Sequence, residues 1–162
     1  MIERTLILLK PDCIQRGFIG EIITRFEKVG LKIVGMKMVY ATKEFAGKHY
    51  FDVEKRHGKK VFDSNVKYLT EGPIVAVCLE GVSAIEIIRK MVGSTEPRAS
   101  LPGTIRGDYS HVSYEHADVK NIAAKNLIHA SASKDDAKKE LDLWFKKEEL
   151  HSYKTVHEIH TL

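Results

Sequence analysis

The chain has 162 residues, of which 43% are hydrophobic and 30% charged, a composition typical of a globular protein folded as a single domain over residues 1–162. Its formal net charge of +4 suits small anionic ligands such as phosphates, but the basic residues are too dispersed to predict nucleic-acid binding. The longest apolar run, residues 74–79, is too short to cross a membrane, and the N-terminus lacks a signal-peptide layout. Cys13 and Cys78 lie far apart without paired spacing, so we expect free thiols and a cytoplasmic protein.

The first elements alternate between buried strands and an amphipathic helix. Residues 5–9 form an apolar run that predicts a strand, and Pro11 ends it directly after Lys10. Lys10 is therefore either presented at a strand end, where binding groups often lie, or is a solvated loop lysine. Apolar residues at helical spacing predict a helix over residues 20–29, and residues 32–40 then predict a second strand.

A helical hairpin with a basic tip is expected next. Thr42 can cap its first helix, which carries His49 and Tyr50, and basic, glycine-containing residues 56–60 lead into its second helix. Such a hairpin is equally consistent with a lid over a phosphate compound and with a solvated corner of the fold.

The middle of the chain predicts a buried strand over residues 74–79 and a helix. Ser83 and Glu86 have the spacing of a capping box at the start of that helix, and Arg89 lies near its end. Residues 93–108 show little hydrophobic periodicity but contain three possible anion ligands, Thr95, Arg98 and Arg106. Because long ordered loops in compact domains are usually functional, we expect this loop to line a site.

The stretch around His129 is the strongest candidate for chemistry. Leu127 and Ile128 predict a short buried strand that delivers His129 to a strand end, and the following helix buries an apolar stripe. Glu140 interrupts that stripe, and a buried carboxylate requires a partner, for which His129 and Ser131 are the nearest candidates in sequence. The pattern fits either an imidazole nucleophile oriented by an acid and a hydroxyl, or a core histidine beside an acid at the edge of the stripe.

In order, these elements predict an α+β fold. Without the hairpin and the loop, the order of elements is β-α-β-β-α-β, which is that of a ferredoxin-like sandwich with an antiparallel sheet. The full prediction adds an inserted helical hairpin and a long active-site loop to this core. Residues 109–125 alternate at first and then contain a helix-like stretch over residues 117–124, and we interpret them as a small accessory hairpin or turn. The tail histidines His151, His157 and His160 lack ligand spacing, so we expect a solvated tail there.

Several motifs resemble the nucleoside diphosphate kinase family, from Arg4 to about Tyr153. They are Lys10-Pro11-Asp12, Gln15-Arg16-Gly17, Gly20-Glu21-Ile22-Ile23, Arg25-Phe26-Glu27, His49-Tyr50, residues 102–108 and Asn126-Leu127-Ile128-His129. The resemblance implies a cytosolic enzyme that moves the γ-phosphate of a nucleoside triphosphate such as ATP to a nucleoside diphosphate. It further implies a ping-pong route through a phosphohistidine, a need for Mg²⁺, and a homohexamer or, less often, a tetramer.

The resemblance also assigns roles to particular residues. His129 matches the nucleophile, phosphorylated at its pros nitrogen, although the residues alone do not distinguish the two ring nitrogens. Ser131 and Glu140 match the pair that supports it. The residues that match groups holding the phosphates or the sugar, or lining the histidine's pocket, are Lys10, Tyr50, Arg89, Thr95, Arg106 and Asn126. Positive charge and forked donors suit phosphoryl transfer, which depends mainly on positioning and charge stabilisation.

Three departures from the family pattern affect these expectations. Ala132 stands where an acid is usual, so no metal ligand is assigned with certainty and Mg²⁺ would be held mainly by the nucleotide phosphates and water. Val61 aligns with the phenylalanine that stacks on the base, with Phe62 beside it, so either residue could pack there. The spacer between Asp108 and Asn126 is longer than usual by about ten residues, and we expect an external excursion, for example at a subunit contact.

Two other functions are weaker on the same residues. A non-enzymatic RNA-binding module on this fold would need exposed aromatic residues on its central strands, whereas these strands are aliphatic. An inactive scaffold is disfavoured by the retention of His129 together with Lys10, Arg89 and Arg106. Partners are therefore expected to be nucleoside tri- and diphosphates and further copies of the chain, without nucleic acid or membrane.

Overall fold

One antiparallel sheet organises the part of the chain that the structure, a computed structural model, describes, which is residues 1–161. Its strands lie in the order β2-β3-β1-β4, with bounds β1 (Ile2–Leu9), β2 (Lys32–Val39), β3 (Ile74–Val82) and β4 (Ile128–Ala130). Every neighbouring pair is antiparallel. This is the strand order of a split βαβ unit, so the ferredoxin-like prediction is confirmed.

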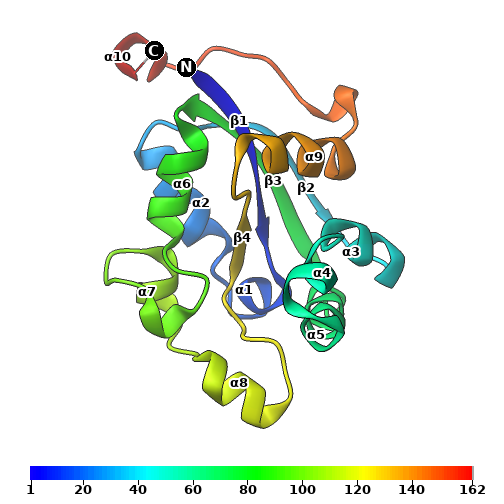
Figure 1. The fold of residues 1–162 in the computed structure, drawn as a ribbon. Helices are drawn as coiled ribbons and strands as arrows, with labels where there is room; N and C mark the ends of the chain where they lie inside the picture. The colour runs from blue at the N-terminus through cyan, green and yellow to red at the C-terminus, as the bar shows by residue number, and fades with distance from the viewer. Residues whose placement is uncertain (162) are drawn as a thin grey trace.

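Helices cover both faces of the sheet (Figure 1). One face packs against α2 (Ile19–Lys28) and α6 (Ala84–Val92), and the other packs against α3 (Lys43–His49), α5 (Lys59–Leu69) and α9 (Lys134–Trp144). The remaining helical segments are α1 (Pro11–Gln15), α4 (Val53–His57), η1 (Pro97–Ala99), α7 (Ile105–Tyr109), α8 (Tyr114–Lys120), η2 (Lys147–Glu149) and α10 (Glu158–Thr161).

The central strand β1 is buried on both sides because its apolar residues alternate between two cores. Ile7 and Leu9 face the α2–α6 layer, whereas Leu6 and Leu8 face the layer formed by α3, α5 and α9. This explains why residues 6–9 form an unbroken apolar run rather than an alternating one. Leu8 also pairs with His129 across β1 and β4, which places the histidine beside the carboxyl end of β1, where Lys10 follows.

Two local expectations need correction. Ser83 adopts a left-handed conformation with φ of 49°, so its hydroxyl makes no cap hydrogen bond and the predicted capping box is absent. The backbone N–H of Ile85 instead donates to the Glu3 carboxylate at 3.4 Å. Residues 109–125 are not a hairpin or turn but contain α8, capped by Ser113, whose hydroxyl accepts from the N–H of His116.

The predicted hairpin forms and consists of α3, α4 and α5. Thr42 caps α3 as expected, with its hydroxyl accepting from the N–H of Phe45 at 3.1 Å. None of the helices within residues 1–161 has the length and hydrophobicity needed to cross a bilayer.

Candidate active site

A strained turn sets the position of His129. Leu127 has φ of 68°, and the N–H of Ile128 donates back to the carbonyl of Asn126 at 2.8 Å, which is a γ-turn of the rare positive-φ kind. The N–H of Leu127 donates to the buried carboxylate of Asp12 at 3.1 Å. That carboxylate also accepts from the Tyr68 hydroxyl at 2.5 Å, so three segments of the chain hold the turn before the histidine.

Arg106 links two segments of the chain in the same region through hydrogen bonds. Arg106 is 6% exposed, and its guanidinium donates to four backbone carbonyls, those of Asn126, Ile128, Gly93 and Ser94. The helix α7 that carries it packs tightly, because a Cβ at Gly107 would lie 2.1 Å from the carbonyl oxygen of Leu101. Arg106 therefore joins the long loop to the His129 strand, and most of its donors are already engaged.

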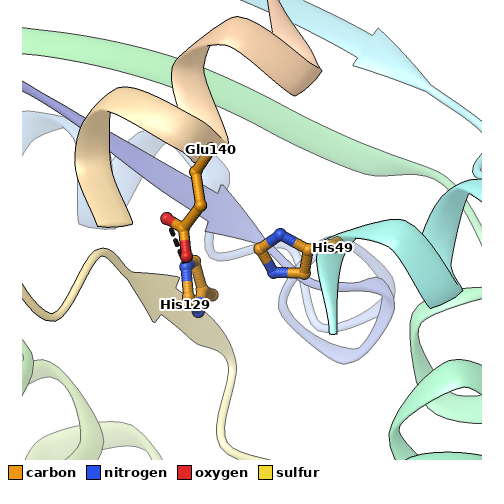
Figure 2. Close-up of side chains that lie close together, drawn as sticks. All are labelled: His49, His129 and Glu140. Atoms are coloured by element: carbon orange, nitrogen blue, oxygen red, sulfur yellow. Dashed lines mark hydrogen bonds and ion pairs between the residues drawn. The ribbon is translucent and has the colours of Figure 1, made fainter. Parts of the chain in front are cut away.

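Glu140 and Ser131 lie behind His129 and fix its ring. Nε2 of His129 lies 2.9 Å from Oε2 of Glu140, which also accepts from the Ser131 hydroxyl at 2.6 Å. Because an ionised carboxylate only accepts, Nε2 carries the proton and Nδ1 carries the lone pair. Figure 2 shows the Nδ1 side of the ring turned away from Glu140.

His49 completes a cluster with His129 and Glu140 whose possible metal-ligating atoms lie within 4.8 Å of one another. Trp144 argues against a metal there. Its indole Nε1–H donates to Nδ1 of His49 at 3.2 Å, which places the proton of a neutral His49 on Nε2. Neither nitrogen of His49 is then free to ligate an ion, and we interpret the cluster as part of a catalytic site.

A pocket of about 610 Å³ opens in front of His129. It brings together most of the residues expected at the site, and these lining residues are Lys10, Tyr50, Val61, Arg89, Thr95, Arg106, Asn126 and His129. Ser131 and Glu140 lie outside the lining, as suits residues that support the ring from behind. Arg98, the other possible anion ligand of the loop, is also outside it and lies 3.6 Å from Glu96.

The basic residues that line this pocket include three that lack a carboxylate partner among the described residues. Lys10, Arg89 and Arg106 form no ion pair with any carboxylate among residues 1–161. Lys10 is 7% exposed and donates to Oδ1 of Asn126 at 2.8 Å. Burial, with a further contribution from the charge of Arg106, lowers the pKa of Lys10 to about 7, against an opposing effect of Asp12. The charge of these three residues is therefore available to an anionic ligand.

Val61 and Phe62, the two residues predicted as candidates to pack on the base, have different surroundings. Val61 lines the pocket and is 41% exposed, whereas Phe62 packs against the core between the sheet and α3. The 109–125 spacer was predicted to be an external excursion, and that prediction is wrong in part, because seven of its residues line the pocket. These are Tyr114, Ala117, Asp118, Asn121, Ile122, Ala123 and Ala124. It leaves the His129 strand in place, as predicted.

Sequence reasoning missed the supporting roles of Asp12, Tyr68, His49 and Trp144. Asp12 could have been found from its place directly after the Lys10 strand end. Tyr68 and Trp144 lie on helical apolar faces, so their periodicity explains them as core residues without revealing their hydrogen bonds.

The fold and the site together define an enzyme that handles phosphate groups with a histidine at its centre. The family model of nucleoside diphosphate kinase matches residues 3–150, and the chain belongs to that family. The nucleoside diphosphate kinase of Borreliella burgdorferi is 42% identical over 156 residues, covering 95% of this chain and 93% of that protein. That of Pyrococcus furiosus is 49% identical over 152 residues, covering 94% and 88% respectively.

Solved structures of similar proteins agree with this assignment. A transition-state mimic of the Borrelia burgdorferi enzyme with bound vanadate and ADP superposes with a TM-score of 0.96 at 41% identity, covering 99% of this chain and 96% of that one. The halophilic enzyme from Halobacterium salinarum in complex with CDP gives 0.86 at 36% identity, covering 99% and 98%.

Proposed function

We propose that this protein transfers the γ-phosphate of a nucleoside triphosphate such as ATP to a nucleoside diphosphate, through a phosphohistidine on Nδ1 of His129. The observation that carries the proposal is the pocket itself, where three cations without carboxylate partners surround a histidine held through its Nε2. A polyphosphate chain would supply the missing negative charge. The carboxylate–imidazole hydrogen bond would leave Nδ1 as the attacking atom.

In the first half-reaction, the lone pair of His129 Nδ1 forms a bond to the γ-phosphorus. The bond from that phosphorus to the bridging oxygen breaks, and its electron pair leaves with the nucleoside diphosphate. The imidazole gains positive charge as this happens, and Glu140 stabilises that charge through Nε2–H, while Ser131 fixes the carboxylate. No proton has to leave the ring.

In the second half-reaction, a terminal oxygen of another nucleoside diphosphate attacks the phosphorus, and the N–P electron pair returns to Nδ1. Lys10 and Arg89, which line the pocket, would bind phosphate oxygens, and Asn126 and Thr95 would supply polar groups beside them. One covalent intermediate serves donor and acceptor in turn, so only groups common to all nucleotides need be recognised.

Mg²⁺ supplies charge neutralisation to the phosphates when it is bound. The pocket fits an ion carried by the nucleotide, because Asp118 is the one carboxylate among the lining residues and Ala132 offers no ligand. The chain's own part is to bind and orient the phosphates.

Assembly and location complete the proposal. Within residues 1–161, the edge strand β2 has β3 as its one partner strand and exposes Met36, Met38 and nearby Tyr40, which suits a sheet edge covered by another copy of the chain. We propose a cytoplasmic homohexamer, with a tetramer as the alternative, formed by single domains of residues 1–162. Sedimentation equilibrium distinguishes six copies from four, and a monomer would refute the assembly.

A labelling experiment tests the function. The protein is incubated with γ-labelled ATP and Mg²⁺ and freed of nucleotide, and the chain is then examined for label that survives base and is lost in acid. We expect such label, its transfer to added GDP or CDP, and none on a His129→Ala variant. Absence of label from the folded unmodified protein would refute the proposal.

A further inference from the structure

His49 presents a buried hydrogen-bond donor without a partner. Its side chain lies at the end of α3 and is 6% exposed. Because Nδ1 accepts from the Trp144 indole, the proton of the neutral ring lies on Nε2, and that nitrogen has no partner among the described residues. Buried donors are nearly always paired, so an exception calls for an explanation in terms of a ligand or a reaction.

The unpaired donor lies beside the reacting histidine. The rings of His49 and His129 have centroids 4.6 Å apart and meet edge to face at 84°. Figure 2 shows a nitrogen-bearing edge of His49 facing His129 from the side of α3, while Glu140 approaches from α9. The neighbouring Tyr50 hydroxyl is the other buried group here that lacks a partner. Tyr50 lines the pocket in front of His129, whereas His49 is not among the lining residues and lies with its ring directly against that of His129.

The surroundings keep His49 neutral. Burial, and then the charges of His129 and Lys10, lower the pKa of His49 well below the usual value for histidine. A neutral ring fixed by Trp144 has one tautomer and one orientation. It is a preorganised dipole, which costs no rearrangement when negative charge arrives.

We propose that His49 is a second catalytic histidine, which donates Nε2–H to an oxygen of the phosphoryl group carried by His129. This inference rests on the function proposed above. The donor would be unpaired in the resting protein and satisfied in the transition state and the phosphoenzyme. An interaction made mainly in those states accelerates the chemical step rather than tightening ground-state binding.

A pair of substitutions separates this role from a purely structural one. In His49→Asn, the amide oxygen can stand near the place of Nδ1 and accept from Trp144, but no donor replaces Nε2–H. In His49→Gln, the longer side chain places its amide nitrogen near the position of Nε2. The exposed His151, changed to Asn, is the matched control, because its described hydrogen bond is made by its backbone to Val34.

The readouts are the single-turnover rate of His129 phosphorylation by ATP and the dissociation constant of ADP. We expect His49→Asn to slow phosphorylation roughly 10- to 100-fold with little change in ADP affinity. We expect His49→Gln to retain most of the rate and His151→Asn all of it. A fast Asn variant with a slow Gln variant, or equal loss in both, would overturn the proposal.

The role of His49 can also be tested in the unmodified protein, without any substitution that could disturb folding. Nitrogen-correlated NMR of the histidine rings reports the proton on His49 Nε2 before and after phosphorylation of His129. We expect its resonance to move downfield as the new hydrogen bond forms. A His49 proton on Nδ1, or an unchanged Nε2–H resonance in fully phosphorylated protein, would refute the role.

The two proposals fail in different ways. If the unmodified protein takes no acid-labile label from ATP, the phosphotransfer itself is wrong. If it does, and the His49 pair or the NMR signal behaves otherwise than expected, only the role of His49 is wrong.

Discussion

The two walls of the pocket are built differently. The inner wall, formed by Lys10, Arg106, Asn126 and His129, is made of buried or half-buried polar side chains tied to each other or to the backbone. The outer wall, formed by α4, α5 and the 109–125 spacer, carries half-exposed side chains such as Val61 and Tyr114. Its ion pairs are partly exposed and include Arg56 with Asp52, four residues apart, and Lys125 with Glu71, which joins the spacer to the end of α5.

This difference separates chemistry from nucleotide recognition. The inner wall holds reacting groups in fixed geometry, which phosphoryl transfer requires. The outer wall offers mostly non-directional contact to whatever base lies against it. An enzyme that accepts many nucleotides needs that combination, and four predictions test the contrast from the largest expected effect to the smallest.

Removal of the nucleophile should abolish function while leaving the pocket able to bind. We expect His129→Ala to lower nucleoside diphosphate kinase turnover by roughly 10⁵-fold or more, since no other group can carry the phosphoryl. A coupled spectrophotometric assay measures turnover, and calorimetry with ADP measures binding. Retained turnover would show that His129 is not the nucleophile.

Glu140→Gln should slow the reaction without loosening the nucleotide. The amide is nearly the same shape but cannot stabilise positive charge on the imidazole, so we expect transfer to fall about 10- to 100-fold with ADP affinity nearly unchanged. Single-turnover rates and ADP titrations measure the two effects. A large affinity loss with normal transfer would move Glu140 from support to binding.

Lys10 should couple nucleotide binding to proton uptake. Its pKa of about 7 leaves it mostly neutral in the free protein at pH 8.5, and bound phosphates would raise that pKa and favour the ammonium. ADP binding should then take up about one proton, and affinity should fall as pH rises above 7 by up to about tenfold per unit. Calorimetry in buffers of different ionisation enthalpy measures the uptake.

Proton uptake on ADP binding is expected from Lys10 of the inner wall, so a variant without this amine is the control. The Lys10→Gln variant should show no uptake attributable to this group. Absence of proton uptake on ADP binding to the unmodified protein at pH 8.5 would mean that Lys10 is already charged there.

Val61→Phe should tighten binding at the outer wall. An aromatic ring there can stack on any base, so we expect ADP, GDP and CDP to bind about 3- to 10-fold more tightly with similar ratios among them. Phe62→Leu, which alters the core face instead, is the matched control for nearby perturbation. Tightening for a single base alone would contradict an unselective outer wall.

The sheet and the inner wall were largely predictable from sequence. The unbroken apolar run of β1, the end of that strand at Lys10, and the carboxylate at Glu140 within an apolar stripe are all local patterns with direct physical causes. Each of them places a group at the site without knowledge of distant contacts.

The outer wall was not predictable to the same degree. The helix α8 is short and mostly polar, so its sequence lacks the periodicity that marks a packed helix. The unpaired nitrogen of His49 depends on Trp144, 95 residues away, and no spacing rule connects them. Ser83 matched a capping motif, but the turn from β3 forces it into a conformation where its hydroxyl cannot serve.

The backbone angle and the burial of Leu127 favour different residue types at this position. Its positive φ favours glycine, whereas its fully buried side chain belongs to the core beneath α6. Glycine would ease the torsion but empty the space, and valine or isoleucine would fill part of the space at a backbone angle that β-branched residues avoid. In a saturation mutagenesis screen, the residue two places before the reacting histidine should therefore tolerate almost no substitution, although it never touches substrate.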